Sequence, residues 1–463
     1  MNGRRQNGQQ LELDLTGEGE GEAPECPGKR VEPVGTNHET ESQAETERLI
    51  EEVCERENLE RALKKVKSNR GSPGIDGMTV IELRGYLKRH WPTIREQLLA
   101  GTYEPKPVKR VQIGKPTGGT RDLGIPCVLD RFIQQAVLQV LQERWDTTFS
   151  EHSYGFRPGR SAHQAVVQAQ QYVVDGYKYV VDIDLEKFFD RVNHDMLMAR
   201  IAKRVSDKRM LRLIRAFLNA GIMDGGLVKP PTDDGVPQGG PLSPLLSNLF
   251  LDDLDRELER RGHRFARYAD DCNIYVRSER AGQRVMENVK QFLGRKLKLR
   301  VNETKSKVAL VNQRKFLGFR LTLPRGSKPP HRQISPQSLE RFKKRVRELT
   351  RRTLGHSFDQ VIWDLSEYLR GWRGYYGFCE QLTKLKLLDS WIRRRLRSYL
   401  WTQWKTPQKR RKALIKLGLV SWEAASLAAS GKGAWEISKT KPIHMVLGNK
   451  FFMEKGLISL AAK

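Results

Sequence analysis

The spacing of apolar residues divides the chain into an N-terminal stretch without periodicity and a long body that alternates helices and strands. Residues 1–45 are rich in Gly, Glu, Gln and Pro and nearly free of aromatic residues, which predicts a flexible, locally acidic tail. From about residue 46 helical spacing begins in "LERALKKVKSN", followed by the turn cluster "RGSPGIDG". A helix predicted over "DRFIQQAVLQVLQERW" carries one apolar stripe of Phe132, Ile133, Ala136, Val137, Val140 and Leu141.

Alternation with a period of two predicts the first clear strand in "KYVVDIDL". There Tyr179, Val181 and Ile183 share one face, and Asp182 and Asp184 share the other. The surrounding segments are predicted as a loop "SYGFRPGRS", a helix "AHQAVVQAQQYV", a helical region over 195–220, a Gly/Pro loop "DDGVPQGGPLSP", and helices "LLSNLFLDDLDRELERRG" and about 281–297. Strands that alternate with helices in this way favour an α+β fold with a palm-like layer.

Two adjacent carboxylates, Asp270 and Asp271, interrupt a strand-forming stretch in "RFARYADDCNIYVR". Branched and aromatic residues on both sides predict a tight β-hairpin with these two residues as its tip. The turn lacks the Gly that primed turns prefer, so we expect backbone strain, which is tolerated more often at functional sites.

The composition changes after about residue 325, where the segments become helical, basic and aromatic. Residues 331–412 hold 21 Lys and Arg against 7 Asp and Glu. This balance predicts a separate basic helical domain. Its aromatic residues either stack on nucleic-acid bases or pack in the core, and the core is the more common role of helical aromatics: Trp372, Tyr375, Tyr376, Trp391, Trp401 and Trp404.

The whole chain has 463 residues and a formal net charge of +28. Such an excess of cations indicates a polyanionic partner, and without an isolated amphipathic anchor nucleic acid is favoured over a membrane. No apolar run approaches the roughly 20 residues that span a bilayer. The five cysteines lie far apart and form no C-x-x-C pair, so neither a zinc site nor a disulfide framework is indicated and a reducing cytoplasm is expected.

If the two acidic segments neighbour one another in a sheet, Asp184, Asp270 and Asp271 converge, with Asp182 as the alternative ligand on the first strand. Like charges a few Å apart raise one another's pKa, and hard Mg²⁺ relieves the conflict. Two ions about 3.5–4 Å apart can activate a primer 3′-hydroxyl and stabilise departing pyrophosphate. A lone Asp-Asp pair is more often a surface turn, but the second acidic strand favours the metal site.

These motifs resemble those of group II intron-encoded reverse transcriptase/maturases over about residues 46–463. "YADD" looks like the catalytic hairpin of reverse transcriptases. Other segments follow in the order of that family: "GSPGIDGMTV", "KPTGGTRDLGIPCVLDRFIQQAV", "HSYGFRPGRSAHQA", "VVDIDLEKFFDRVNH", "GVPQGGPLSPLLSNLFLDDLD" and "RKFLGFRL", with "LRGWRGYYGF" and "WIRRRLRSYLW" similar to the thumb/maturase domain. Each motif is modest alone, but their order is a strong signal.

The resemblance implies a right-hand polymerase of fingers, palm and thumb that adds dNTPs to a DNA primer on an RNA template. It implies an N-terminal extension and fingers (46–180), a palm (181–325), a basic thumb/maturase domain (326–430) and a C-terminal segment (431–463), with the acidic tail (1–45) outside the match. The catalytic and metal-binding residues implied are Asp184, Asp270 and Asp271, with two Mg²⁺ ions. Nucleotide contacts are implied for Lys115, Arg121, Phe189 and Gln238, and a primer grip for Phe316, Leu317, Gly318 and Phe319.

Several of these assignments have structural alternatives. Phe189 would exclude a ribose 2′-hydroxyl, but burial cannot be assigned between it and Phe188 from sequence. A plain hydrophobic strand fits "FLGF" equally well. RNA contacts are expected from Arg157 and Arg160, for which structural ion pairing is about as common, and from the basic clusters Arg393, Arg394, Arg395, Lys409, Arg410, Arg411 and Lys412.

The expected partners are a group II intron RNA, an RNA template, a DNA primer and dNTPs in a bacterial cytoplasm or nucleoid, with no membrane. No H-N-H nuclease pattern follows residue 430, so we expect no second-strand cleavage by this chain. Two other hypotheses compete: a domesticated relative acting in DNA repair or defence, and a catalytically dead RNA chaperone. The intact "YADD" and Asp184 count against the dead chaperone.

Overall fold

The computed structural model describes residues 47–114, 120–224, 227–229 and 239–462. The chain forms two units, Met1–Ala44 and Glu45–Lys463, and all described residues lie in the second. None of the described helices is both long and apolar enough to cross a membrane.

The N-terminal helices of the body pack around one buried helix, α5 (Val128–Trp145). The six residues of its predicted stripe are at most 5% exposed, which confirms that prediction. The buried Asn58 amide donates to the carbonyls of Val53 and Ala136 and so fastens two neighbouring helices to α5. The two fastened helices are α2 (Leu49–Val53) and α3 (Arg56–Ser68), and α4 (Leu83–Ala100) follows them.

A small mixed sheet with the strand order β2–β1–β4–β5 lies next along the chain. β1 and β2 form an antiparallel hairpin, and β4 runs parallel to β1. The predicted helical region over 195–220 consists of two helices, whose first turns are capped by the side chains of Asn193 and Asp207. The bounds are β1 (Val108–Gly114), β2 (Thr120–Ile125), β4 (Ile222–Asp224), β5 (Leu227–Lys229), α7 (His194–Ala202) and α8 (Lys208–Leu218).

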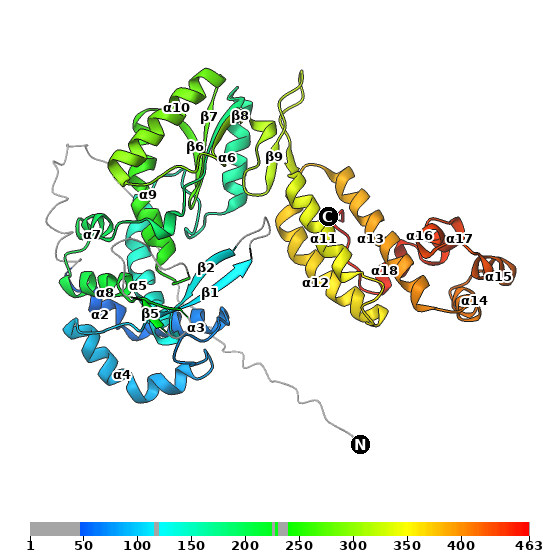
Figure 1. The fold of residues 1–463 in the computed structure, drawn as a ribbon, viewed down its shortest axis with the longest axis horizontal. Coiled ribbons are helices and arrows are strands. Elements are labelled where there is room, and N and C mark those ends of the chain that lie inside the picture. The colour runs from blue at the N-terminus through cyan, green and yellow to red at the C-terminus, as the bar shows by residue number, and fades with distance from the viewer. Residues whose placement is uncertain (1–46, 115–119, 225–226, 230–238, 463) are drawn as a thin grey trace, which may run out of the picture. The chain divides into compact units, whose positions relative to one another are not determined.

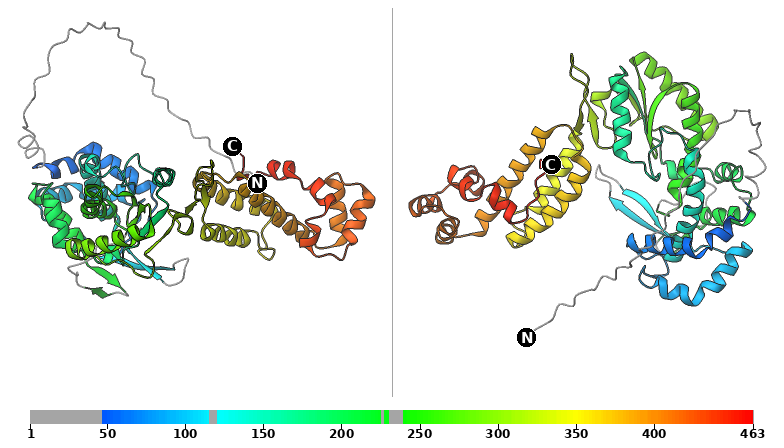
Figure 2. Two further views of the ribbon diagram at one scale, coloured as in Figure 1. Left: turned by 90° about the horizontal axis from the view of Figure 1, so that it is seen from above. Right: turned by 180° about the vertical axis from the view of Figure 1, so that it is seen from behind.

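A second, fully antiparallel sheet with the order β6–β7–β3–β8 forms the palm. Alternation sends Val181 and Ile183 of β3 into the core under α9 and α10, whereas Val180 packs with α6 on the opposite face. The sheet is therefore covered on both faces (Figures 1 and 2). The bounds are β3 (Tyr179–Ile183), β6 (Arg264–Tyr268), β7 (Asp271–Val276), β8 (Lys307–Leu310), α6 (Ala162–Val174), α9 (Ser243–Arg260) and α10 (Glu279–Phe292).

The last part of the chain is a short two-stranded ribbon followed by helices, shown in yellow to red in Figure 1. Ser335, Ser357 and Thr406 cap the first turns of three of these helices through their side-chain oxygens. Ile443, Phe452 and Leu460 pack in the same core as these helices and α6. The bounds are β9 (Phe319–Leu321), β10 (Arg332–Ile334), α11 (Pro336–Leu349), α12 (Phe358–Tyr376), α13 (Leu382–Gln403), α14 (Pro407–Lys416), α15 (Ser421–Ala429), α16 (Ala434–Ile437), α17 (Lys441–Val446) and α18 (Asn449–Glu454).

The predicted α+β fold with an antiparallel palm sheet and a helical C-terminal region is confirmed. The aromatic residues of that region divide between two environments. Trp372 and Trp401 are 8% and 2% exposed and belong to the core, while Tyr375 and Tyr376 are partly buried against the segment at 316–319. Core packing therefore explains Trp372 and Trp401.

Candidate active site

The hairpin that carries the acidic pair joins β6 to β7. Tyr268 pairs with Asp271, so the two-residue tip consists of Ala269 and Asp270, and Asp271 is the first residue of β7. The prediction that Asp270 and Asp271 form the tip is wrong by one residue. The expected strain lies at Ala269, whose φ of 57° is in the left-handed region that alanine seldom adopts.

The strand register brings the acidic segments together. Ile183 of β3 pairs with Cys272 of β7, so the next positions along the two strands, Asp184 and Asp271, meet at one edge of the sheet. Asp271 reaches solvent, yet enough protein surrounds it that desolvation, followed by repulsion from Asp270, Asp182 and Asp184, raises its pKa to about 7. A carboxyl group perturbed by other carboxylates in this way gains from a bound cation.

Two basic side chains supply the positive charge next to this cluster. Lys305 Nζ lies 3.2 Å from Asp184 Oδ1, and Arg314 Nη2 lies 2.5 Å from Asp182 Oδ2. The Asp182 side chain is 20% exposed and accepts hydrogen bonds from both Nε and Nη2 of Arg314, whereas the Asp184 side chain is 32% exposed and its partner Lys305 is 64% exposed. This difference favours Asp184 over Asp182 as the residue open to a ligand.

The donor set suits a hard divalent cation, because carboxylates contribute oxygen atoms, and their mutual repulsion adds to desolvation in raising the pKa of Asp271. Within the described residues, no three His, Cys, Asp or Glu side chains stand close enough to form a finished metal site. Asp184, Asp270 and Asp271 would be the carboxylates to hold such a cation, and Lys305 contacts the first of them.

A cavity of about 690 Å³ opens beside the hairpin. Phe189 lines it, whereas Phe188 is 2% exposed and belongs to the core, so the structure distinguishes the two aromatics that sequence could not. The lining comes from several parts of the fold: Val66, Asn69, Leu123, Arg131, Gln135, Leu138, Phe156, Phe189, Gly239, Gly240, Pro241, Ser243, Pro244, Tyr268, Ala269, Asp270, Asp271 and Leu317.

Arg131 is a cavity residue that sequence reasoning missed. Its Nη2 donates to the Ser72 carbonyl at 2.6 Å, and burial lowers its pKa. Gly71 leaves room for the guanidinium, since a Cβ there would lie 2.1 Å from Arg131 Nη1. The only signal in the sequence was an arginine in the first turn of a predicted helix, within the motif that also carries Lys115 and Arg121.

Gly239 and Gly240 allow neighbouring segments of the protein to approach closely. A Cβ at Gly239 would lie 2.2 Å from the Gly124 carbonyl oxygen, and one at Gly240 would lie 2.3 Å from Gln134 Oε1. The close contacts are thus with β2 and α5. Two predicted nucleotide contacts, Lys115 and Gln238, lie outside the described residues, and of Arg121 only its backbone pairing with Ile113 is described.

The segment "FLGF" forms a tight hairpin rather than a plain strand. Phe316 and Phe319 exchange backbone hydrogen bonds of 2.8 and 2.9 Å, and Leu317 and Gly318 have φ values of 50° and 82°, as in a type I′ turn. Leu317 lines the cavity, and its carbonyl accepts a 2.8 Å bond from the Tyr375 hydroxyl. Helix α12 therefore holds the tip of this hairpin at the cavity.

The basic residues expected to contact RNA fall into two groups. Arg157 is buried: its guanidinium pairs with Asp146 and donates to the carbonyls of Ser150 and Ser153. The RNA-contact prediction for Arg157 is therefore wrong, because every donor of this side chain is used inside the fold. Arg160 is half-buried, 3.4 Å from Glu151.

The C-terminal basic clusters show the same division. Arg394 lies 3.8 Å from the centre of the Trp435 ring, Arg395 donates to the Thr350 hydroxyl, and Arg410 lies 4.7 Å from the Trp401 ring centre. Arg393 is half-buried. The side chains exposed on the surface are Lys409, Arg411 and Lys412.

Comparison with known proteins gives two family matches. Residues 113–321 match the family described as reverse transcriptase (RNA-dependent DNA polymerase), and residues 339–418 match the group II intron maturase-specific domain. The first match contains the acidic strands, Phe189 and the hairpin at 316–319. The second contains α12 and the basic clusters on α13 and α14.

The chain is also similar to curated proteins and to a solved structure. Protein YkfC of Escherichia coli is 32% identical over 352 residues, which cover 67% of this chain and 92% of that protein. The group II intron-encoded protein LtrA of Lactococcus lactis is 28% identical over 57% of this chain, which spans about half of LtrA's length (55%). A solved partial Cas6-RT-Cas1–Cas2 complex is 27% identical over 53% of this chain and 42% of that one, with a TM-score of 0.35.

Proposed function

The chain belongs to the family of group II intron reverse transcriptases and maturases, and on that premise we propose that it is an RNA-directed DNA polymerase that also binds a group II intron RNA and assists its splicing and mobility. The observation that supports the polymerase proposal is the register of β3 and β7, which places Asp184 beside Asp271 at one end of the sheet, with Asp270 next to it in the hairpin tip and a cavity of about 690 Å³ alongside. Proposed substrates are dNTPs, an RNA template and a DNA primer.

Reverse transcriptases depend on divalent cations, and we propose two Mg²⁺ ions held by the three carboxylates. When bound, Mg²⁺ supplies charge neutralisation of the triphosphate and activation of the primer 3′-hydroxyl. The protein orients the reactants: Phe189 stands in the cavity where it excludes a ribose 2′-hydroxyl, and Leu317 at the hairpin tip supports the primer end. Arg131 adds a fixed positive charge for phosphate or template.

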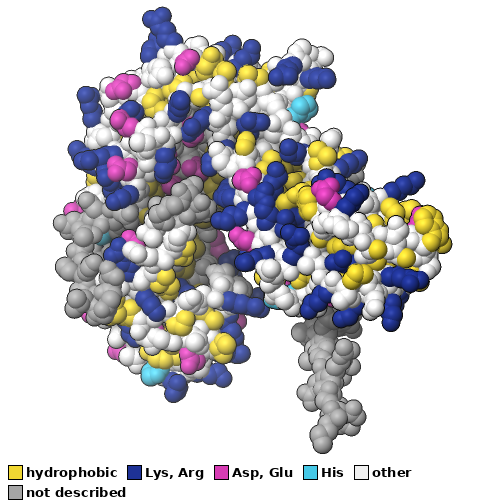
Figure 3. Space-filling model, turned by 45° about the vertical axis from the view of Figure 1, so that its right-hand side comes forward, with side chains coloured by type: hydrophobic (Ala, Val, Ile, Leu, Met, Phe, Trp, Pro, Cys, Tyr) yellow, Lys and Arg dark blue, Asp and Glu magenta, His cyan; other side chains and the backbone are white. Residues whose placement is uncertain are grey.

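The RNA-binding part of the proposal rests on the basic surface. Lys and Arg side chains outnumber acidic ones over the visible face in Figure 3. Lys409, Arg411 and Lys412 are exposed within the region that matches the maturase domain, and such side chains supply most nonspecific affinity for RNA. The proposed compartment is the bacterial cytoplasm, and the four described cysteines are unpaired.

Primer extension tests the polymerase proposal. Wild-type protein is given an RNA template, a DNA primer, dNTPs and Mg²⁺, alongside Asp270→Asn and the control Asp175→Asn, an exposed aspartate at the end of α6. We expect extension by the wild type and the control, and loss of about 10³-fold or more for Asp270→Asn. Absence of extension by the wild type would overturn the function. Normal extension by Asp270→Asn would overturn the site.

A further inference from the structure

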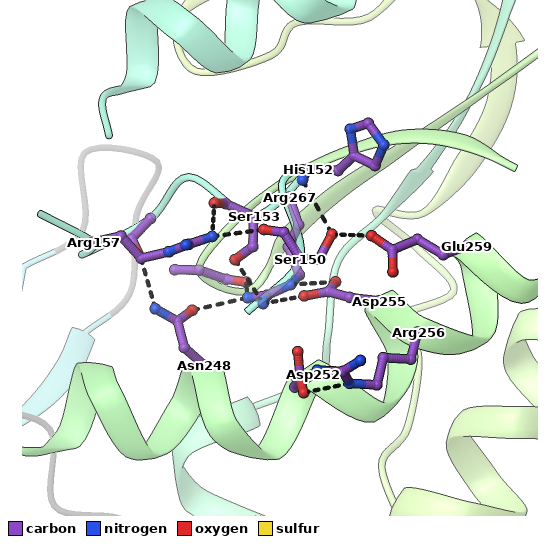
Figure 4. Close-up of polar contacts among 12 residues, drawn as sticks. Ser150, His152, Ser153, Arg157, Asn248, Asp252, Asp255, Arg256, Glu259 and Arg267 are labelled. Atoms are coloured by element: carbon purple, nitrogen blue, oxygen red, sulfur yellow. Dashed lines mark hydrogen bonds and ion pairs between the residues drawn. The ribbon is translucent and has the colours of Figure 1, made fainter. Parts of the chain in front are cut away.

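The largest fully buried side chain of the described residues, Arg267, lies directly before the acidic hairpin and has no part in the function derived so far. All five of its N–H groups have acceptors (Figure 4). Nε and Nη2 donate to the two carboxylate oxygens of Asp255 at 2.7 and 2.5 Å, forming a fork-to-fork pair. The remaining acceptors are Asn248 Oδ1 at 3.0 Å, the Ala269 carbonyl at 2.9 Å and Ser153 Oγ at 2.8 Å.

These bonds join α9 and the acidic hairpin, which follow one another in sequence, to a loop 114 residues before Arg267. Asp255 and Asn248 belong to α9, whose first turn lines the cavity at Ser243. Ser153 belongs to the loop of "SYGFRPGRS". The fifth bond reaches Ala269, the residue with the left-handed backbone at the hairpin tip, next to Asp270.

The loop at 150–157 is itself fixed, so it can act as an anchor. Its backbone pairs with β6, since Tyr154 N donates to the Arg267 carbonyl and Arg267 N donates to the His152 carbonyl, both at 2.9 Å. A Cβ at Gly155 would lie 2.3 Å from Ala269 N, so the loop lies directly against the hairpin tip. Arg157, at the end of the loop, forms an ion pair with Asp146 and so fixes the loop to the preceding segment.

Stability alone is a weak reason for this arrangement. Replacing a buried ion pair by apolar residues of similar volume is often neutral or stabilising, because the charges lose their hydration. What apolar side chains cannot reproduce is the directed bond to the Ala269 carbonyl. Lysine cannot reproduce it together with the paired bonds to Asp255, because it lacks the planar fork.

We propose that Arg267, held by Asp255, is a positioning residue of the polymerase site: it fixes the strained tip at Ala269 and thereby the placement of the Asp270 and Asp271 carboxylates. This inference rests on the proposed function. Arg267 touches no reactant, so it acts only through the hairpin. A shift of about 1 Å in catalytic groups lowers turnover by about 10²-fold, which sets the expected size of the effect.

The test compares Arg267→Lys and the apolar double variant Arg267→Met/Asp255→Leu with matched controls. Arg264→Lys makes the same change at an exposed position of β6, and Asp253→Asn changes an aspartate of α9 that is 46% exposed. Four quantities are measured on the full chain: kcat and KM for dNTP, affinity for RNA, and hydrogen exchange of the amides at 270–272. Exchange reports hairpin opening whether or not the protein has activity.

We expect Arg267→Lys and the folded double variant to lose about 10²-fold in kcat, while KM for dNTP changes by less than about threefold. Hairpin amides should exchange at least about tenfold faster, with RNA affinity and both controls unchanged. If either folded variant keeps wild-type kcat and hairpin exchange, the proposal is overturned and the pair is merely structural. If Arg267→Lys fails to fold, the double variant decides. If the wild type lacks polymerase activity, the proposed function fails and exchange alone decides on Arg267.

Discussion

The exposed cations of α14 allow a quantitative prediction about RNA binding. Lys409 stands in the first turn of α14, whose N-terminus carries positive partial charge, and Arg411 and Lys412 follow in the second turn. A cation in the first turn costs the helix about 0.3–1 kcal/mol at low salt, so neutralising Lys409 together with the other two should leave the melting temperature unchanged or higher. Helix stability therefore does not explain the cation at Lys409, whereas a phosphate ligand does.

The expected loss of affinity follows from the number of phosphate contacts. Each contact contributes about 0.7 (single strand) to 0.9 (duplex) to the slope of log K against log salt, so changing all three residues to Gln should reduce the slope by about 2–2.7. At about 0.1 M salt this corresponds to roughly 100- to 500-fold weaker binding. The control Lys203→Gln/Lys208→Gln/Arg212→Gln removes as many exposed charges from α7 and α8 and their connection.

Fluorescence anisotropy of a labelled group II intron RNA, titrated with each protein over a series of KCl concentrations, gives the slope of log K against log salt for each of the three proteins. The reasoning is refuted if the α14 variant keeps the wild-type slope, or if the α7–α8 control loses as much. Melting curves of all three proteins verify that folding is intact.

Three further predictions concern the cavity and its hairpins. Because the pKa of Asp271 is raised from the ordinary 3.8 to about 7, the folded state binds more protons than the unfolded one and stability falls as pH rises between these values. By calorimetry without metal, Asp271→Asn should therefore have a higher melting temperature than the wild type at pH 8 and the same melting temperature near pH 4. A lower melting temperature of the variant at pH 8 would contradict the clustering of carboxylates around Asp271. Phe189→Val should reduce the preference for dGTP over GTP by about 10- to 100-fold in kcat/KM, and an unchanged ratio removes Phe189 from sugar selection. Gly318→Ala should destabilise the chain by about 1–3 kcal/mol in urea unfolding, because a Cβ would lie 2.7 Å from Tyr376 Oη at positive φ; Gly326→Ala, also at positive φ but with open space, should cost less.

Local patterns in the sequence predicted the elements that depend on local physics. The apolar stripe of α5, the alternation of β3 and the hairpin around "YADD" follow from helical and strand periods, and all are present. The assignments of Asp184 and Phe189 came from the family resemblance, and the structure adds that Phe189 rather than Phe188 faces the cavity.

What sequence missed depends on contacts between distant segments. Sequence alone does not distinguish Arg157 from an exposed arginine. Only the fold shows that Asp146 and two backbone carbonyls accept its hydrogen bonds. The tip of the hairpin moved by one residue because pairing of Tyr268 with Asp271 is set by the register against β3 and by Arg267, neither of which a local pattern contains. The Arg131 guanidinium fits at the cavity because residue 71 is a glycine, and this contact joins segments that are distant in sequence.

The central claim is that Asp184, Asp270 and Asp271 together hold the divalent ions of a polymerase. Its most direct test is a titration of bound Mn²⁺ by electron paramagnetic resonance, on the protein with primer, RNA template and dNTP. The account predicts two ions per wild-type and Asp175→Asn chain, and fewer in each of Asp184→Asn, Asp270→Asn and Asp271→Asn. Unchanged binding in all three active-site variants would contradict it.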